Sequence, residues 1–342
     1  MTIAAARLEQ IRALLDGTPF KGAELHPLAG DASFRRYIRV RKDGLAAMLM
    51  DAPPDKEDVG TFISVAEYLC GQGYSAPSIL ARDAGAGLLL LEDLGDDSFT
   101  SVLKREGGLE RELYGAAIDV LVHWHDEAKG FSQPESLVLP AYNLELLMRE
   151  VSLFTDWYLP QIMEAGKAEA LRPEYLEIWR AILSGASLAE NVWVHRDYHA
   201  DNLMWLPERK HVQRVGLLDF QDGVYGDAAY DLVSLLEDAR RDVPKDLAEA
   251  MIERYLENSG VDHEKFLSAY AILGAQRNSK IIGIFARLAV RDDKQGYLNY
   301  LPRVWGHLEN DLAHPLLRPL KNWMDRHVPA QYRGVISIKE KL

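Results

Sequence analysis

The sequence predicts a two-lobed α+β fold, with a small antiparallel-sheet lobe over residues 1–95 and a larger, mainly helical lobe over residues 96–342. Three observations lead to this prediction. The first part contains short strand-like runs, Gly-containing turns and one further helical pattern after the opening helix. The second part is dominated by long stretches with helical apolar spacing. A chain of 342 residues is also long enough for one large domain or two lobes.

The elements of the first lobe follow in order along the chain. An amphipathic helix opens it, and a strand is expected just before Gly30. Residues 36–41 alternate polar and apolar side chains, a Lys-Asp-Gly turn follows, and residues 45–50 are apolar, which is typical of a hairpin. Apolar residues at helical spacing from Phe62 to Leu69 predict one helix. Two more short strands are expected, over residues 78–82 and 87–92.

The second lobe is expected to be helical with one interruption. Helical apolar spacing covers residues 109–129, 144–170, 173–189, 228–240 and 265–290. The interruption, residues 192–219, contains two strand-like runs on either side of a Pro-Glu-Arg-Lys turn. This pattern predicts a hairpin embedded among the helices.

Composition excludes several classes of protein. A net charge of −13 argues against a nucleic-acid partner, because such proteins present a basic surface to phosphates. A single cysteine, Cys70, excludes an internal disulfide framework and favours the reducing cytoplasm. The most apolar stretch, residues 281–290, is short and contains Arg287, so no membrane association is expected. No feature of the sequence indicates an obligate protein partner.

The embedded hairpin carries the strongest chemical motif. Asp197 is followed five residues later by Asn202, and Asp219 stands 22 residues after Asp197 at the end of an apolar run. Phosphoryl transfer needs a carboxylate that accepts the proton of the attacking hydroxyl, and an amide oxygen and a second carboxylate that hold Mg²⁺. A hairpin between Asn202 and Asp219 would return the second metal ligand beside the first. We therefore expect Asp197 to be the base and the other two residues to be the metal ligands.

A metal-dependent hydrolase is the alternative of another class. His195, Asp197 and His199 alternate, and on a strand they would share one face, as metal ligands often do. This alternative leaves Asn202, Asp219 and the N-terminal sheet without a role.

At these residues the chain resembles the aminoglycoside-phosphotransferase-like kinases, a branch of the protein-kinase-like fold. The resemblance covers nearly the whole chain and extends to residues 225–232, Tyr-Gly-Asp-Ala-Ala-Tyr-Asp-Leu. It implies ATP and Mg²⁺ as cofactors. It also implies that Asp231 braces the backbone of the catalytic loop and that His195 supports this loop structurally.

Within this branch the chain is most similar to the bacterial kinases that phosphorylate the anomeric hydroxyl of N-acetylmuramate and N-acetylglucosamine in peptidoglycan recycling. The similarity is carried by residues 30–37, 50–54, 90–95 and 284–288. It implies an amino sugar substrate and a sugar 1-phosphate product. A kinase of another small alcohol, such as an aminoglycoside, choline or homoserine, is the alternative within the same class.

The nucleotide-binding residues are less clearly marked. By resemblance, Ser33, Phe34 and Arg36 lie where this fold covers the phosphates with a turn, and an ordinary hairpin turn without ligand contact is the alternative. By resemblance, the backbone of Glu92 and Leu94 would pair with adenine at the lobe hinge.

The third strand lacks the lysine that usually contacts the α- and β-phosphates. Either Arg35, Arg36 or Arg39 supplies this charge, or the metal does most of the neutralising. The absence also leaves open a nucleotide-binding protein without catalysis.

A basic stripe is predicted on the last long helix. Arg277, Lys280, Arg287 and Arg291 fall near one face at helical spacing. The stripe is either a solvated face or partly borders the cleft. In the second case we expect Arg287 and Arg291 to bind an anion of the substrate, such as the lactyl carboxylate of N-acetylmuramate.

Overall fold

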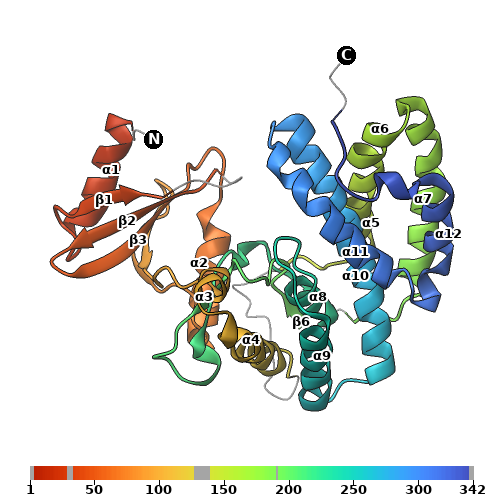
Figure 1. Ribbon diagram of the computed structural model, residues 1–342. Helices are drawn as coiled ribbons and strands as arrows, with labels where there is room; N and C mark the ends of the chain where they lie inside the picture. The colour runs from red at the N-terminus through yellow and green to blue at the C-terminus, as the bar shows by residue number, and fades with distance from the viewer. Residues whose placement is uncertain (1–3, 29–33, 127–138, 190–191, 339–342) are drawn as a thin grey trace. The chain divides into compact units, whose positions relative to one another are not determined.

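The computed structural model describes residues 4–28, 34–126, 139–189 and 192–338 (Figure 1). These residues form two compact units. The first unit comprises the described residues up to Ala117 together with the segment Asp201–Asp222, and the second unit comprises the rest. The hairpin segment therefore belongs to the same unit as the N-terminal sheet. The boundary expected after residue 95 stays a prediction.

The first unit is built on a five-stranded antiparallel sheet with the strand order β1-β2-β3-β5-β4. Helix α1 packs Ile11 and Leu15 into the same core cluster as Ile38, Val40 and Leu49 of the sheet. These strand residues share one face of the sheet because successive side chains point to opposite faces, and residues of the other face, such as Arg39 and Met50, are also buried. The sheet and the following helix α2 confirm the predicted order. Their bounds are α1 Ala5–Asp16, β1 Glu24–Pro27, β2 Arg36–Lys42, β3 Leu45–Asp51, α2 Val59–Gly71, β4 Ile79–Asp83 and β5 Leu88–Glu92.

The predicted hairpin is present in this unit as β7 (Leu203–Trp205) and β8 (Val215–Leu217). The two strands are antiparallel, with Leu203 opposite Leu217. The backbone N–H of Leu217 donates to the carbonyl of Ser75 at 2.8 Å, and the Arg209 guanidinium pairs with the Glu92 carboxylate. These contacts join the hairpin to Ser75, which follows α2, and to Glu92, the last residue of β5. Along the chain, β5 is followed by α3 Phe99–Arg105, the short 3₁₀ helix η1 Gly107–Leu109 and α4 Glu110–Trp124.

The second unit is helical around α10 (His263–Arg291), which packs against α5, α8 and α11 (Figure 1). A two-stranded ladder, β6 (Val192–Val194) with β9 (Val224–Gly226), leads into and out of the predicted catalytic segment. The other helices are α5 Leu144–Leu153, α6 Leu159–Ile162, α7 Ala165–Gly185, α8 Ala229–Leu236, α9 Lys245–Ser259, α11 Leu301–Asp311 and α12 Arg318–His327.

One predicted helix boundary is wrong. The sequence pattern places a break before Pro173, but Pro173 lies inside α7, and the chain breaks instead at Met163 and Glu164, which are extended. A proline inside a helix costs about 3 kcal/mol because it removes a hydrogen bond and crowds the preceding turn. The burial of Tyr175 and Trp179 on α7, each worth up to about 3 kcal/mol, offsets this cost.

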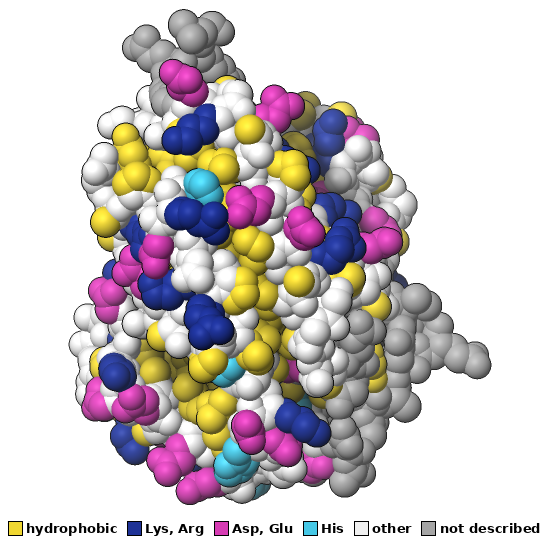
Figure 2. Space-filling view, turned by 90° about the vertical axis from the view of Figure 1, so that its right-hand side faces the viewer, with side chains coloured by type: hydrophobic (Ala, Val, Ile, Leu, Met, Phe, Trp, Pro, Cys, Tyr) yellow, Lys and Arg dark blue, Asp and Glu magenta, His cyan; other side chains and the backbone are white. Residues whose placement is uncertain are grey.

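The surface carries both signs of charge. On the face drawn in Figure 2, Lys and Arg side chains are interspersed with Asp and Glu and with small apolar patches. This face shows no continuous basic area of the kind that binds nucleic acid. Within the described ranges, no helix combines enough length and apolar character to cross a membrane.

The contact of α10 with the end of α5 requires glycine at position 283. A Cβ at Gly283 would lie 2.6 Å from the backbone nitrogen of Phe154 and closer still to the Leu153 carbonyl, and backbone atoms cannot move aside easily. We expect Gly283→Ala to destabilise the protein by about 1–3 kcal/mol through overpacking. Urea unfolding should show a lower midpoint.

Gly306 is the matched control, because it lies exposed inside α11 with nothing within 4 Å of an added Cβ. Gly306→Ala should raise the midpoint, since alanine is favoured over glycine inside a helix by about 0.5–1 kcal/mol. Equal effects of the two substitutions would contradict the close approach.

Candidate functional site

The loop that carries Asp197 is held by a buried carboxylate. It follows β6, and Asp231 of α8 accepts hydrogen bonds from the backbone N–H of His195 at 2.6 Å and of Arg196 at 2.9 Å. Arg196 has a φ of +73°, a conformation that side chains other than Gly, Asn and Asp rarely adopt. Burial raises the pKa of Asp231 to about 7, although the two N–H donors act against this by stabilising the charged form. Asp231 thus makes the contacts that a brace of this loop requires.

A second buried carboxylate, Glu150 of α5, contacts the same loop from another side. It forms ion pairs with the guanidinium of Arg196 and, at 3.5 Å, with the ammonium of Lys280 on α10. Tyr142 and Gln276 also donate hydrogen bonds to it, Gln276 at 3.0 Å. Burial alone would raise the pKa of Glu150, but the two cations outweigh it and lower the pKa. Glu150 therefore stays ionised and fixes the Arg196 side chain directly before Asp197.

The charge around Asp197 favours its ionised form. Burial raises the pKa of Asp197, but Lys280, then His199, Arg277 and Arg196 act in the opposite direction and hold it below the usual range. The residue is not fully buried, so part of it is open to solvent. A carboxylate that is ionised and accessible at neutral pH is suited to accept a proton.

Helix α10 contributes an unusual run of buried polar residues to this environment. Five consecutive residues, Gln276–Lys280, are polar and buried. Because they pass once around a helix of about 3.6 residues per turn, α10 is enclosed on all sides at this level. Four of the five side chains have a hydrogen-bond partner. The partners are Glu150 for Gln276, Ser234 for Arg277, Glu237 and Asp311 for Asn278, and Tyr230 for Lys280.

The predicted basic stripe is therefore divided. Its first half, Arg277 and Lys280, is buried near Asp197 and is not a solvated face. Arg287 is partly buried and Arg291 is exposed, with its guanidinium on the neighbouring Asp292 at 2.7 Å. A substrate contact for Arg287 and Arg291 stays a prediction.

The two histidines of the motif do not form a metal cluster with Asp197. The His195 ring packs against the edges of Trp124 and Tyr198, and His199 Nε2 lies 3.1 Å from the Arg240 guanidinium. Across the part of the chain that the structure describes, no three His, Cys, Asp or Glu side chains are placed to hold a metal ion. This geometry argues against the hydrolase alternative.

The predicted magnesium ligands lie together at one end of the β7–β8 hairpin in the first unit. The backbone carbonyl of Asn202 accepts the N–H of Leu218 at 3.0 Å, so Asn202 and Asp219 leave the ladder side by side. Asp219 has a φ of +61°, and its side chain is 51 % exposed. An amide oxygen and an accessible carboxylate are ligands that Mg²⁺ prefers, with waters and phosphates completing its shell. The residues present fit a magnesium ion bound together with a nucleotide.

The predicted nucleotide contacts are placed as follows. Ser33 lies outside the described residues, and Phe34 is 62 % exposed. Arg36 is paired at 2.6 Å with the buried Asp51, which it shares with Arg7. The Glu92 side chain binds Ser78 and Arg209, and Leu94 packs close to Gly216.

Sequence reasoning missed Glu150. It stands in an ordinary helical pattern, 46 residues before the arginine that it binds, and no motif surrounds it. It also missed Glu57, which pairs with Arg35 just before α2.

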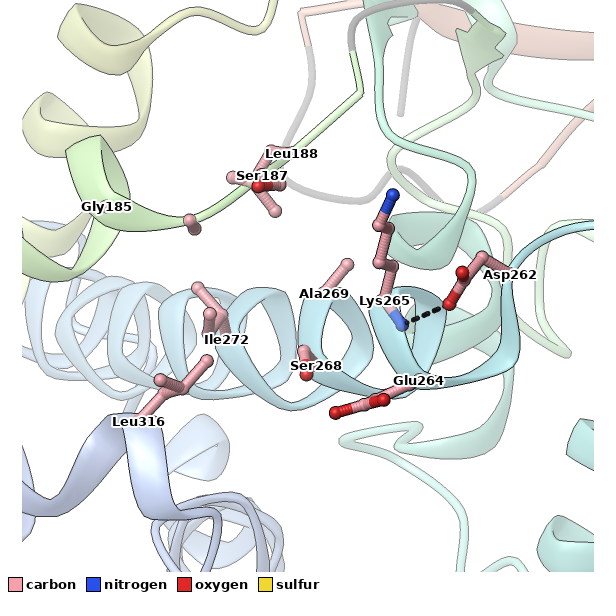
Figure 3. Close-up of a pocket in the computed structure, with 11 residues that line it drawn as sticks. Gly185, Ser187, Leu188, Asp262, Glu264, Lys265, Ser268, Ala269, Ile272 and Leu316 are labelled. Carbon is pink, nitrogen blue, oxygen red and sulfur yellow. Dashed lines mark hydrogen bonds between the residues drawn. The ribbon is translucent and has the colours of Figure 1, made fainter.

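A separate pocket of about 340 Å³ lies on the second unit, between the end of α7 and the first turns of α10 (Figure 3). Asp262 caps α10 there by accepting the backbone N–H of Lys265 at 3.0 Å, while Ala269, Ile272 and Leu316 make an apolar wall. None of the predicted site residues lines this pocket.

Comparison with known proteins agrees with these features. The chain is 36 % identical to the N-acetylmuramate/N-acetylglucosamine kinase of Caulobacter vibrioides, over 97 % of this chain and 100 % of that protein. It is 39 % identical to the kinase of the same name from Pseudomonas aeruginosa, over 85 % of this chain and 84 % of that one.

Solved structures of low sequence identity share the fold. An aminoglycoside phosphotransferase in complex with GDP and kanamycin has a TM-score of 0.62 at 15 % identity, covering 91 % of this chain and 99 % of that one. A choline/ethanolamine kinase family protein from Mesorhizobium loti has a TM-score of 0.60 at 14 % identity, covering 94 % and 99 %. The predicted two-lobed, protein-kinase-like fold is thus confirmed. The profile of the phosphotransferase enzyme family matches residues 24–268, and the chain belongs to this family.

Proposed function

We propose that this kinase transfers the γ-phosphoryl group of ATP to the anomeric hydroxyl of N-acetylmuramate or N-acetylglucosamine, with Mg²⁺ held by Asn202 and Asp219. The substrate assignment is supported by relatives that carry this activity in their names at 36 % and 39 % identity. The observation that carries the chemistry is the half-buried Asp197, held ionised by surrounding cations on a braced loop. A role in peptidoglycan recycling and a cytoplasmic location remain predictions.

In the proposed reaction Asp197 orients the sugar O1–H and takes its proton. The sugar oxygen forms a bond to the γ-phosphorus while the bond from this phosphorus to the β,γ-bridging oxygen breaks, which gives the sugar 1-phosphate and ADP. Magnesium, when bound, offsets the charge on the phosphate oxygens. In this proposal Arg196 and Asp231 act by keeping the Asp197 loop in place.

The position of the new phosphate tests this proposal. Purified protein is incubated with Mg·ATP and, in turn, N-acetylmuramate, N-acetylglucosamine, choline and kanamycin. A phosphate on O1 blocks the reducing end, so the product should fail a reducing-sugar assay and show an anomeric phosphate by ³¹P NMR. Transfer to choline or kanamycin alone would refute the substrate, and a product that keeps its reducing end would refute the attacked hydroxyl.

Loss of the proton acceptor should slow the chemical step. We expect Asp197→Asn to lower kcat by about 10²–10⁴-fold, at the low end of this range because an anomeric hydroxyl is more acidic than an ordinary alcohol. ATP affinity should be unchanged in equilibrium binding. Glu208→Gln, an exposed carboxylate in the hairpin turn, is the control. A kcat within about threefold of wild type would contradict the role of Asp197 as base.

Removal of Lys280 should shift the pH profile. Lys280 is the strongest of the neighbours that lower the pKa of Asp197, so Lys280→Met, which keeps the volume, should raise that pKa. A base works in its deprotonated form, and the acid limb of kcat/KM should therefore move to higher pH. Lys265→Met, an exposed lysine on the same helix, should leave the limb in place. An unmoved limb in Lys280→Met would show that Lys280 does not act through Asp197.

A further inference from the structure

The third strand of the sheet has no lysine for the nucleotide phosphates, while β2 and the residue before it carry four arginines. Arg41 is exposed near the turn to β3, which leaves Arg35, Arg36 and Arg39 as candidates. Two of them are occupied within the sheet unit. Arg36 pairs with the fully buried Asp51 at 2.6 Å. Arg39 is bound at 2.6 Å to Asp93 and at 2.8 Å to Asp96, in the segment that follows β5. Moving Arg39 to a ligand would leave the buried Asp93 without its cation, which is costly, and moving Arg36 would leave the fully buried Asp51 with Arg7 alone.

Arg35 is placed differently. Its Nε lies 3.2 Å from Glu57 Oε2, just before α2, and its two terminal nitrogens lie 3.7 Å from Asp219 and 3.9 Å from Asp222. The Arg35 side chain is 13 % exposed, whereas the two aspartates are more than half exposed. The guanidinium therefore joins the start of α2 to the proposed metal ligand.

A second contact joins the same two segments. Phe62 of α2 packs on Phe220, the residue after Asp219, with ring centroids 4.9 Å apart. The aromatic pair joins α2 directly to the Asp219–Asp222 segment, and Arg35 lies beside it, between Glu57 and the same segment. In kinases the phosphate-contacting lysine of the third strand is likewise paired with a glutamate of the helix that follows.

We infer that Arg35, positioned by Glu57, binds the nucleotide phosphates in place of the absent third-strand lysine. This inference rests on the proposed function and assigns one of its binding residues. The hydrogen bond to Glu57, at 3.2 Å and between side chains that are 13 % and 19 % exposed, serves as the anchor. The contacts with Asp219 and Asp222 are longer and involve carboxylates that are more than half exposed, and ion pairs with exposed partners contribute little. The terminal nitrogens of Arg35, which face Asp219 and Asp222, are thus the atoms that can turn to a phosphate.

Nucleotide binding gives the first test. A charge-assisted hydrogen bond to phosphate is worth about ten- to a hundredfold in affinity, so Arg35→Ala should weaken Mg·ADP binding in calorimetry by that factor. Arg35→Lys should lie between wild type and Arg35→Ala, because lysine keeps the charge without the planar fork. Glu57→Gln should weaken binding less than Arg35→Ala, since it removes only the anchor. The control is Arg82→Ala, which breaks the ion pair between Arg82 of β4 and Glu67 of α2. It should leave the affinity for Mg·ADP unchanged.

The affinity for Mn²⁺ without nucleotide gives a second test, in which Arg35→Ala should strengthen binding and not weaken it. In the nucleotide-free protein Arg35 competes with a cation for Asp219, so Arg35→Ala should bind Mn²⁺ more tightly, by about two- to fivefold for a solvated pair. Electron paramagnetic resonance titration with Mn²⁺ alone measures this. A residue that only supports the fold would lower both affinities.

The outcomes separate this inference from the proposed function. Wild type that binds Mg·ADP, with Arg35→Ala within about twofold of it, overturns the inference and leaves the kinase assignment intact. Weaker binding of both nucleotide and Mn²⁺ also overturns it, since Arg35 would then be structural. Wild type that binds no nucleotide contradicts the proposed function and the inference together.

Discussion

The second unit depends on the ion pair between Glu150 and the two cations Arg196 and Lys280. These three residues come from α5, from the loop after β6 and from α10, which are far apart in the sequence. An ionised group without a partner in this interior would cost several kcal/mol, so each residue requires the other two. The pair also compensates for the unfavourable backbone conformation of Arg196, which would otherwise cost about 1–3 kcal/mol. The Asp197 loop is thus held in position by charge neutralisation between Arg196 within the loop and residues of α5 and α10.

The same principle is found in the first unit on a smaller scale. There Glu57 pairs with Arg35, and Asp51 and Asp93 pair with Arg36 and Arg39 of β2. Each carboxylate restricts a long side chain that would lose rotamer entropy on binding. In both units, ion pairs within the protein therefore fix the conformations of charged side chains.

Much of the fold and part of the site could be predicted from the sequence. The alternation in residues 36–41 and the spacing from Phe62 to Leu69 are local signals, and the structure has a strand and a helix there. The motif from Asp197 to Asp219 was recognisable because residue types and spacing are set by the chemistry. The three-residue strands β6 and β9 were not predicted, since they are too short to show a period of two.

The remaining features depend on contacts that no local pattern contains. Arg35, Arg36 and Arg39 are equivalent candidates in the sequence, and only their partners in space distinguish them. Likewise, Arg277 and Lys280 carry charge on a helix and were as consistent with an exposed face as with burial. Their burial follows from Ser234, Tyr230 and Glu150, which lie 43, 50 and 130 residues away from their respective partners in the chain.

The buried run Gln276–Lys280 has a consequence for how α10 is seated. An apolar helix in an apolar groove can slide or rotate by one residue at moderate cost, because hydrophobic contact has little directionality. Here a shift of one residue would separate four buried polar side chains from their partners at once, each with a desolvation penalty of about 1–3 kcal/mol. Misaligned packings of α10 are therefore strongly disfavoured relative to the native one. The buried polar run thereby fixes a single packing register for α10, the longest helix of the described chain.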